Sequence, residues 1–360
     1  MRFSDLRWLS LKTRITLFTL LVFLLGIWLL ALYGSRVLRQ EMQDQLSAHQ
    51  FPTVTLLAAQ VNAELAERMA VLKSAAHAIT PARLANAASL QEFLEAGQVQ
   101  AQLFNAGVYI TRMDGTAIAS VPLVAGRVGI NFLDQHHLAV TLQQGQSIIS
   151  KPRIGKALHR PVFAMTAPIR DERGQVTGAV VGVVDLSQPN FLDKVTESRF
   201  GKTGGYVLMS AAHRVTITAT DKSRIMEPLP APGVNPLMER YLQGYEGSGS
   251  VVDSRGVTVI SSSRQIPQAG WVLVARIPAD EAFAPIALVQ RRLLLAALVF
   301  TVVAGALIWW ATWALLRRQL SPLLKATQAL DSMTGSDAAL KTLPMASHDE
   351  IGNLIGGFNR

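Results

Sequence analysis

Two long apolar runs without charged residues lie near the two ends of this chain of 360 residues, at residues 15–34 and 293–316. A helix needs about 20 apolar residues to cross a hydrocarbon core of about 30 Å, and each run is that long. The first run exceeds the apolar core of a secretory signal peptide, roughly 7 to 15 residues, and no small-x-small cleavage site follows it. The sequence therefore predicts two transmembrane helices with a large region between them.

Positive charge before the first run sets the predicted orientation. Residues 1–14 contain four Lys or Arg side chains against one Asp, and ends rich in Lys and Arg stay in the cytoplasm. We therefore expect residues 35–292 to lie in the periplasm and residues 317–360 to return to the cytoplasm. The predicted location is the inner membrane of a bacterium, with the chain crossing it twice.

Charge, cysteine content and motifs exclude several classes of function. The net charge is +9, but many of the basic residues flank the apolar runs. The sequence contains no block of Lys and Arg interleaved with aromatics, so nucleic-acid binding is not predicted. The chain has no cysteine, which excludes disulfides and thiolate ligands. It also lacks the Gly-x-Ser-x-Gly, His-Glu-x-x-His and Gly-x-Gly-x-x-Gly motifs. We predict no catalytic residue, no metal site and no cofactor within these residues.

Between the apolar runs, a helical pattern is followed by strand patterns. Apolar residues recur at the helical period from Leu57 to Leu72, which predicts a long amphipathic helix that ends before Pro81. Pro52 is expected to break or kink the start of this helix.

Short alternating runs then predict two groups of strands. The predicted strands are 108–110, 117–121, 147–149, 161–169 and 178–186 in the first group, and 205–209, 214–219, 249–252, 257–262 and 271–277 in the second, with a helix near 236–245. Each group begins with a strand led by tyrosine and ends with a long apolar strand, which indicates a weak internal repeat. The fold class is α+β, with two antiparallel sheets in modules at about 80–190 and 195–285.

The C-terminal tail predicts two short helices. After Pro322, apolar residues recur with the 3-4-3 spacing of a coiled-coil seam. A second helix opens with Ser347 and Glu350, which can cap each other, and continues through Gly352 and Phe358. In this pattern the tail resembles a truncated HAMP linker, a parallel four-helix coiled coil made by two subunits. The resemblance implies a homodimer in which Pro322, Glu350, Gly352 and Phe358 take part in signal relay.

The region between the apolar runs, about 41–287, resembles a double Cache region. The likeness lies in residues 129–186, with GINFLDQHHL, SKPRIGKALHRPVFAMTAPI and GQVTGAVVGVVDL. It implies two PAS-like sheets and a small ligand in the membrane-distal one, where an acidic residue at the end of the last strand, here Asp185, holds a ligand amine. The family's Arg-x-Trp-Tyr cluster falls at residues 133–138, which read LDQHHL, so ordinary amino acids are disfavoured as ligands.

Acidic and histidine side chains in the distal module are the first ligand candidates. Asp134, His136 and His137 follow a turn at Gly129, and they are candidates for pocket lining or, alternatively, for metal binding. Asp185 at a strand end is a candidate for ligand contact or, alternatively, a solvated carboxylate.

Basic and aromatic side chains are the second group. Arg127 and Arg153 make the expected pocket mouth basic, which favours an anionic ligand such as a carboxylate, with solvated loop charges as the alternative. Tyr109, Phe163 and Met165 are predicted to line the inner face of the distal sheet, with plain core packing as the alternative.

These features together predict a transmembrane receptor. A periplasmic small molecule is expected to act through the HAMP linker, in a homodimer embedded in the lipid bilayer, on a cytoplasmic output domain absent from these residues. The expected output is a diguanylate cyclase or phosphodiesterase of cyclic-di-GMP signalling. A chemoreceptor, a sensor histidine kinase and a membrane adaptor that binds a periplasmic protein are the alternatives.

Overall fold

A computed structural model describes the chain over residues 11–97, 103–253 and 256–333. The chain divides into two compact units, of which one is residues 40–285 and the other is formed by the chain before and after it. The first of these units contains both sheets and the candidate ligand site.

A single helix, α1 (Leu11–Ala78), opens the described chain. It runs without interruption through Pro52, so the predicted break at this proline is wrong. Gln50 and Val54, on either side of the proline, are completely buried, and such tertiary packing outweighs local helix propensity. The helix ends before Pro81, as predicted, and two short helices follow it: α2 (Pro81–Ala85) and α3 (Ala87–Ala96).

The distal module contains the first antiparallel sheet, with the strand order β2-β1-β6-β5-β3 and with β4 pairing to β5. Its strands are β1 (Val108–Arg112), β2 (Ala117–Val121), β3 (Ile148–Ile149), β4 (Arg153–Ile154), β5 (Pro161–Arg170) and β6 (Val176–Asp185). Helix α5 (His136–Gln144) packs on β5 and β6. The five strands predicted for this module are confirmed, and β4 is the one that was missed.

The proximal module contains the second antiparallel sheet, with the order β8-β7-β11-β10-β9. Its strands are β7 (Gly205–Ser210), β8 (Val215–Ala219), β9 (Gly247–Val252), β10 (Thr258–Ile266) and β11 (Trp271–Pro278), and its helices are α6 (Asp193–Thr196), η2 (Lys222–Arg224) and α7 (Pro236–Leu242). In both modules the last strand lies at the centre of the sheet and pairs with the first strand. The internal repeat indicated by the sequence is therefore a repeat of strand order.

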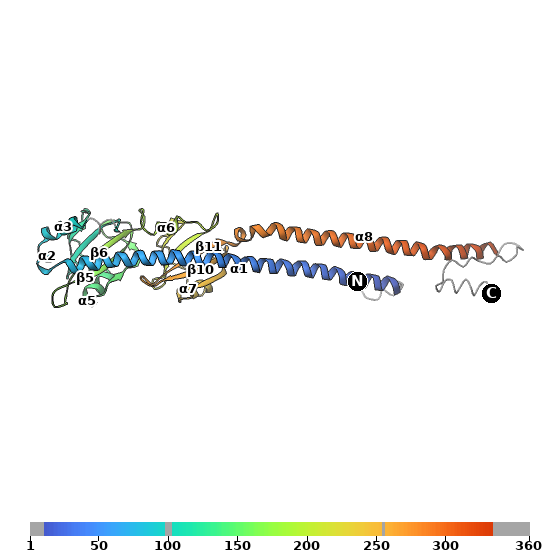
Figure 1. Cartoon of the computed structure of the whole chain (residues 1–360), viewed down its shortest axis with the longest axis horizontal. Coiled ribbons are helices and arrows are strands. Elements are labelled where there is room, and N and C mark those ends of the chain that lie inside the picture. The colour runs from blue at the N-terminus through green and yellow to red at the C-terminus, as the bar shows by residue number, and fades with distance from the viewer. Residues whose placement is uncertain (1–10, 98–102, 254–255, 334–360) are drawn as a thin grey trace. The chain divides into compact units, whose positions relative to one another are not determined.

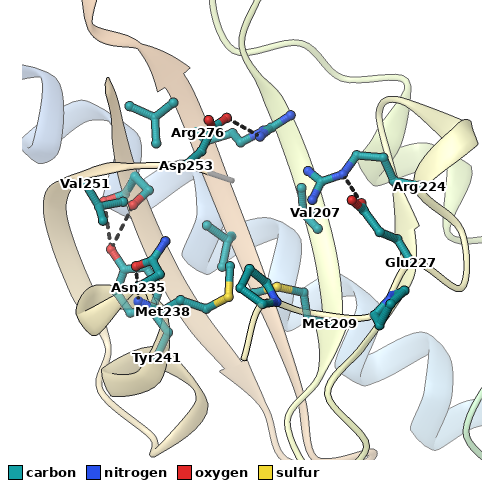
Figure 2. A pocket seen from close by; sticks show the side chains of 15 residues that line it. Val207, Met209, Arg224, Glu227, Asn235, Met238, Tyr241, Val251, Asp253 and Arg276 are labelled. Atoms are coloured by element: carbon teal, nitrogen blue, oxygen red, sulfur yellow. Dashed lines mark hydrogen bonds and ion pairs between the residues drawn. The ribbon is translucent and has the colours of Figure 1, made fainter. Parts of the chain in front are cut away.

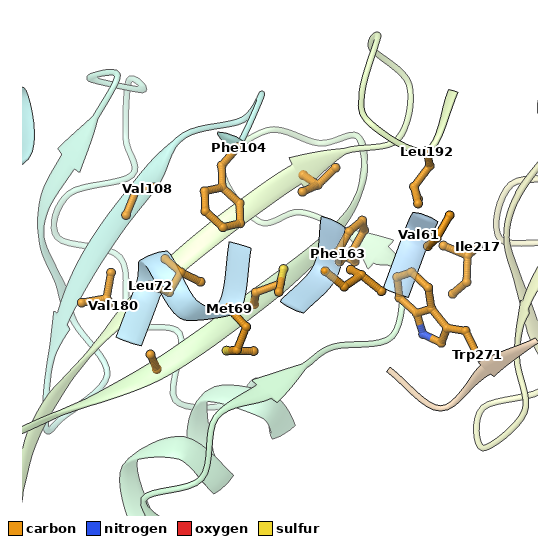
Figure 3. Close-up of a cluster of buried hydrophobic side chains, with 14 of the residues drawn as sticks. Val61, Met69, Leu72, Phe104, Val108, Phe163, Val180, Leu192, Ile217 and Trp271 are labelled. Atoms are coloured by element: carbon orange, nitrogen blue, oxygen red, sulfur yellow. The ribbon is translucent and has the colours of Figure 1, made fainter. Parts of the chain in front are cut away.

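Helix α1 runs along both sheets (Figure 1), and one apolar core joins it to them (Figure 3). Side chains three or four residues apart, from Val61 to Leu72, form a continuous stripe on α1. The distal sheet adds Phe163 and the proximal sheet adds Trp271, whose ring meets Phe163 edge-on with centroids 5.3 Å apart. The two modules are therefore packed as one unit through a shared core.

The other unit contains the two candidate membrane spans. Both helices include an apolar stretch long enough to cross a bilayer, with mean hydropathy 2.1 and 2.4, and almost none of these side chains is buried. Within this unit, Trp28 Nε1 donates a hydrogen bond to Thr301 Oγ1 over 3.2 Å, and Gln290 Nε2 donates to the Ser35 carbonyl over 3.3 Å.

The final helix, α8 (Ala279–Met333), continues directly from β11 and includes the second candidate span. Pro322 lies within this helix. The other predicted relay residues, Glu350, Gly352 and Phe358, lie outside the described residues.

Candidate ligand-binding site

The distal sheet carries a small cavity on the face opposite to the shared core. Successive side chains of a strand point to opposite faces, so Val162 and Ala164 of β5 lie beneath the cavity together with Val183 of β6. Tyr109 of β1 shares this face. The cavity has a volume of about 30 Å³, which is the space of roughly one water molecule.

Two arginines line this cavity: Arg127 from the loop after β2 and Arg153 from the short strand β4. Arg127 is 2% exposed, its Nη1 donates to the Ser120 hydroxyl over 3.3 Å, and its guanidinium carbon lies 5.6 Å from the Tyr109 ring centroid. Arg153 places Nη2 2.8 Å from Nδ1 of His137. Within the described residues, neither arginine forms an ion pair with a carboxylate. Two cations therefore line one cavity without a paired carboxylate from the described part of the chain.

Burial controls the protonation of the groups around these arginines. It lowers the pKa of both guanidinium groups, and the facing Tyr109 opposes this shift. At Arg153 the negative charge of Asp134 also opposes the decrease in pKa. Burial also raises the pKa of the Tyr109 phenol, which therefore stays protonated and neutral. The pKa of the buried His137 falls to about 3, first because of burial and then because of the positive charges of Arg153 and His136. His137 is therefore a neutral imidazole with one ring nitrogen able to accept a hydrogen bond from Arg153.

We expect His137 to make the protein lose stability in mild acid. The unfolded chain binds a proton on this residue with a pKa near 6.5, whereas the folded chain does not bind it until about pH 3, so the free energy of unfolding falls as pH drops from 6.5 toward 3. Between about pH 7 and about pH 5 this single group lowers the free energy of unfolding by about 2 kcal/mol.

The test compares melting temperatures of the full chain in detergent micelles across this pH interval. His137→Asn should show a smaller decrease than the wild-type protein, whereas His136→Asn, at the exposed neighbouring position, should show the wild-type decrease. An identical decrease in His137→Asn and wild type would contradict the neutral, buried state of His137.

Phe163 and Met165 do not line this cavity with Tyr109, and their position agrees with the alternative of plain core packing. Tyr109 is directly opposite Val181 of β6, and Val181 is opposite Thr166 of β5. Residues directly opposite one another on adjacent strands share a face of the sheet. Phe163 and Met165 are an odd number of positions from Thr166 and therefore point into the shared core, where both are completely buried.

Asp134 and His136 lie on a wider groove beside the cavity. Both side chains are exposed, and Asp134 forms an ion pair of 2.6 Å with Lys156. The groove has a volume of about 510 Å³ and is also lined by Lys151 and Arg153. No group of three His, Cys, Asp or Glu side chains in the described ranges is placed to hold a metal ion. Gln135, Arg153 and Lys156 line both spaces, so the groove adjoins the cavity.

Asp185 is buried at the end of β6, and its carboxylate already has partners. Oδ1 accepts hydrogen bonds from the Ser187 backbone N–H at 2.8 Å and from the Ser187 hydroxyl at 2.6 Å. Oδ2 lies 3.5 Å from Arg160 Nη1. The side chain is on the cavity face of β6 but does not line the cavity. In this conformation Asp185 stabilises the turn that follows the strand.

The cavity includes residues that the sequence analysis did not select. Phe132 packs on Tyr109 with ring centroids 5.0 Å apart, and the buried Gln135 lines the wall. The sequence did contain a signal for the two histidines. Leu138 and Leu142, with i, i+4 spacing, mark the buried face of α5. His137 lies on this buried face, whereas His136 is exposed.

Comparisons with known proteins agree with this architecture. The sequence matches the profile of the family dCache_1, a Cache domain, over residues 36–286. Similar solved structures include the ligand-binding domain of Mlp24 with asparagine (TM-score 0.53, 16% identity, 69% of this chain and 98% of that chain). They also include the ligand-binding domain of the amino acid chemoreceptor PctB of Pseudomonas aeruginosa PAO1 in complex with L-Arg (TM-score 0.53, 22% identity, 68% of this chain and 98% of that chain).

A third similar structure is the extracellular domain of a candidate histidine kinase, mmHK1S-Z2 (TM-score 0.51, 14% identity, 65% of this chain and 97% of that chain). At these identities the likeness shows a shared fold. No curated protein matches the chain.

Proposed function

The chain belongs to the Cache domain family dCache_1, and from this premise we propose that it senses a small organic anion in the distal cavity. Domains of this family are extracytoplasmic sensors of membrane receptors, and the two candidate spans fit such a receptor. The observation that supports an anion is the pair Arg127 and Arg153, which line one cavity without forming an ion pair to a carboxylate of the described chain.

A buried charge without a partner is costly, and an anionic ligand removes that cost. Burial of an unpaired ion costs several kcal/mol in a protein interior. A ligand carboxylate accepts charge-assisted hydrogen bonds from guanidinium groups, and such bonds are roughly twice as strong as neutral ones. The neutral His137 and Tyr109 supply hydrogen-bonding groups without adding negative charge. The lining therefore favours an anion over the amine expected from Asp185.

Binding of an organic acid requires the cavity to open. The space of about 30 Å³ holds little more than a water molecule, whereas the adjoining groove measures about 510 Å³. We propose that Arg153 and the loop that carries Lys156 move, so that cavity and groove join around the ligand. A ligand that binds only this open conformation shifts the population toward it, which is how binding changes the state of the receptor.

We further propose that this change reaches the cytoplasm through α8. The last proximal strand, β11, continues directly into α8, which includes the second candidate span and Pro322. In a homodimer, the HAMP-like tail would pass the change to a cyclic-di-GMP enzyme. A chemoreceptor is the second candidate, because the similar structures include a chemoreceptor domain. The coding sequence downstream of Arg360 tests this part of the proposal.

The ligand class is tested by thermal unfolding of the full chain in detergent micelles. We expect monocarboxylic or dicarboxylic acids to raise the melting temperature, because a ligand at 100 times its dissociation constant stabilises the folded state by about 2.7 kcal/mol. Alkylamines of matched size serve as the control and should produce no shift. Stabilisation by the amines alone would contradict an anion site and restore the prediction made for Asp185.

A further inference from the structure

The proximal sheet carries a second cavity (Figure 2). Its volume is about 270 Å³, compared with about 30 Å³ for the distal cavity. Val207 and Val274 project from the sheet on one side, and Met238 of α7 lies on the other. This cavity occupies the same face of its sheet, opposite to the shared core, as the distal cavity does in the first module.

The charges that line this cavity cancel one another. Arg224 Nε forms an ion pair of 2.5 Å with Glu227 Oε2, and Arg276 Nη1 forms one of 3.3 Å with Asp253 Oδ2. All four residues line the cavity together with a majority of apolar side chains. A charged ligand would therefore add an unbalanced charge to a largely apolar space, which is costly.

Two hydrogen-bond donors face each other across this space. Asn235 is 6% exposed, and its Oδ1 accepts from the Met238 N–H over 2.9 Å, whereas its Nδ2 makes no hydrogen bond to the described residues. Arg224 uses Nε for its ion pair, and its terminal nitrogens make no hydrogen bond to that same part of the chain. Figure 2 shows Arg224 and Asn235 on opposite sides of the cavity. A ligand with acceptor groups would satisfy both.

We propose that the proximal cavity is a second ligand site, for an electrically neutral, mainly apolar molecule that carries hydrogen-bond acceptors. A dry cavity of about 150 Å³ accommodates benzene, so about 270 Å³ accommodates roughly ten to twelve non-hydrogen atoms. This proposal is independent of the anion proposed for the distal cavity, because it rests on different residues and on a lining whose charges are balanced.

The absence of cysteine makes a direct test possible. Met238→Cys places a single thiol at the cavity wall, and the rate of its reaction with a maleimide is measured on the full chain in detergent micelles. The probes are phenylacetamide and phenylacetate, which have the same size and differ in charge. We expect phenylacetamide at about ten times its dissociation constant to slow the reaction roughly tenfold, and phenylacetate to leave the rate unchanged.

Two further variants separate occupancy of the cavity from other effects. Leu123→Cys, at an exposed loop position of the distal module, should react at the same rate with and without phenylacetamide. Val251→Trp fills the cavity from β9, and in the Met238→Cys background it should abolish the protection.

Three outcomes would overturn the proposal: protection by phenylacetate alone, protection by neither probe, or protection that persists in Val251→Trp. Arg127→Gln removes a cation from the distal cavity and should leave protection by phenylacetamide intact. Failure of the distal site and failure of the proximal site are therefore distinguishable.

Discussion

Arg127→Met is expected to stabilise the ligand-free protein and, at the same time, to abolish its stabilisation by organic acids. Arg127 is buried, and within the described residues its side chain has the Ser120 hydroxyl and the Tyr109 ring as partners. Replacing a buried ion by an apolar side chain of similar volume is often neutral or stabilising, by roughly 1 to 4 kcal/mol. Methionine is flexible enough to fill the space that the guanidinium leaves. We expect a gain of about 1 kcal/mol, because the hydrogen bond and the ring contact are lost as well.

The loss of ligand binding should be larger than this gain. Removing one partner of a buried charge pair costs about 2 to 5 kcal/mol of binding free energy, roughly 30-fold to several thousand-fold in affinity. The measurement is the melting temperature of the full chain with and without the organic acid that stabilises the wild type. Arg112→Met, at the exposed end of β1, is the matched control and should retain the full shift. A destabilised ligand-free Arg127→Met protein that still responds to the acid would refute the role of Arg127.

The fold could be predicted from the sequence because its signals are local. The strands are short apolar runs bounded by turns, such as the Met113-Asp114-Gly115 turn between β1 and β2, and local patterns of this kind identify strands. The predicted break at Pro52 was wrong because the contacts that keep the helix continuous are not local in the sequence. Burial of Gln50 and Val54 depends on side chains far away in the sequence, such as Ser262, whose hydroxyl donates to Gln50 Oε1 over 2.7 Å.

The site could be predicted only in part, because it depends on how strands pair. Alternation within β5 shows that Phe163 and Met165 share a face, but it does not show which face of the sheet that is. Only the pairing of β5 with β6 and of β6 with β1 shows that Tyr109 lies on the opposite face. A shift of one residue in register would reverse this result. The basic character of the site was predicted because Arg127 and Arg153 are visible in the sequence, whereas their lack of a paired carboxylate requires three-dimensional contacts.

The distal and proximal cavities give the sensor two ligand sites, and the sheets beneath them share one apolar core. Each cavity lies on the outer face of its own sheet, and the inner faces of both sheets pack on the same stripe of α1. Occupancy of either cavity would bias the strands beneath it, and the shared core joins those strands. Such coupling is reciprocal in its free energy. A proximal ligand is therefore expected to change the affinity of the distal site by some factor, and a distal ligand is expected to change the affinity of the proximal site by the same factor.

Trp271→Ala is expected to have the largest effect on stability, because it removes a large buried side chain from the core that the two modules share. Trp271 is 1% exposed, begins β11 and meets Phe163 of the distal sheet edge-on at 5.3 Å. Truncation of a buried tryptophan costs about 3 to 5 kcal/mol, which for a unit of this size lowers the melting temperature by roughly 6 to 20 °C. The measurement is thermal unfolding of the full chain.

Two controls connect this loss to the junction between the modules. Trp271→Phe keeps an aromatic ring against Phe163 and should lose less than half as much stability, because part of the buried surface and the edge-to-face contact remain. Leu56→Ala, at an exposed position of α1, should leave the melting temperature nearly unchanged. In Trp271→Ala, an anion bound to the distal module should still stabilise that module, while the proximal sheet unfolds at a lower temperature. A single transition with an unchanged midpoint would show that the modules do not depend on this contact.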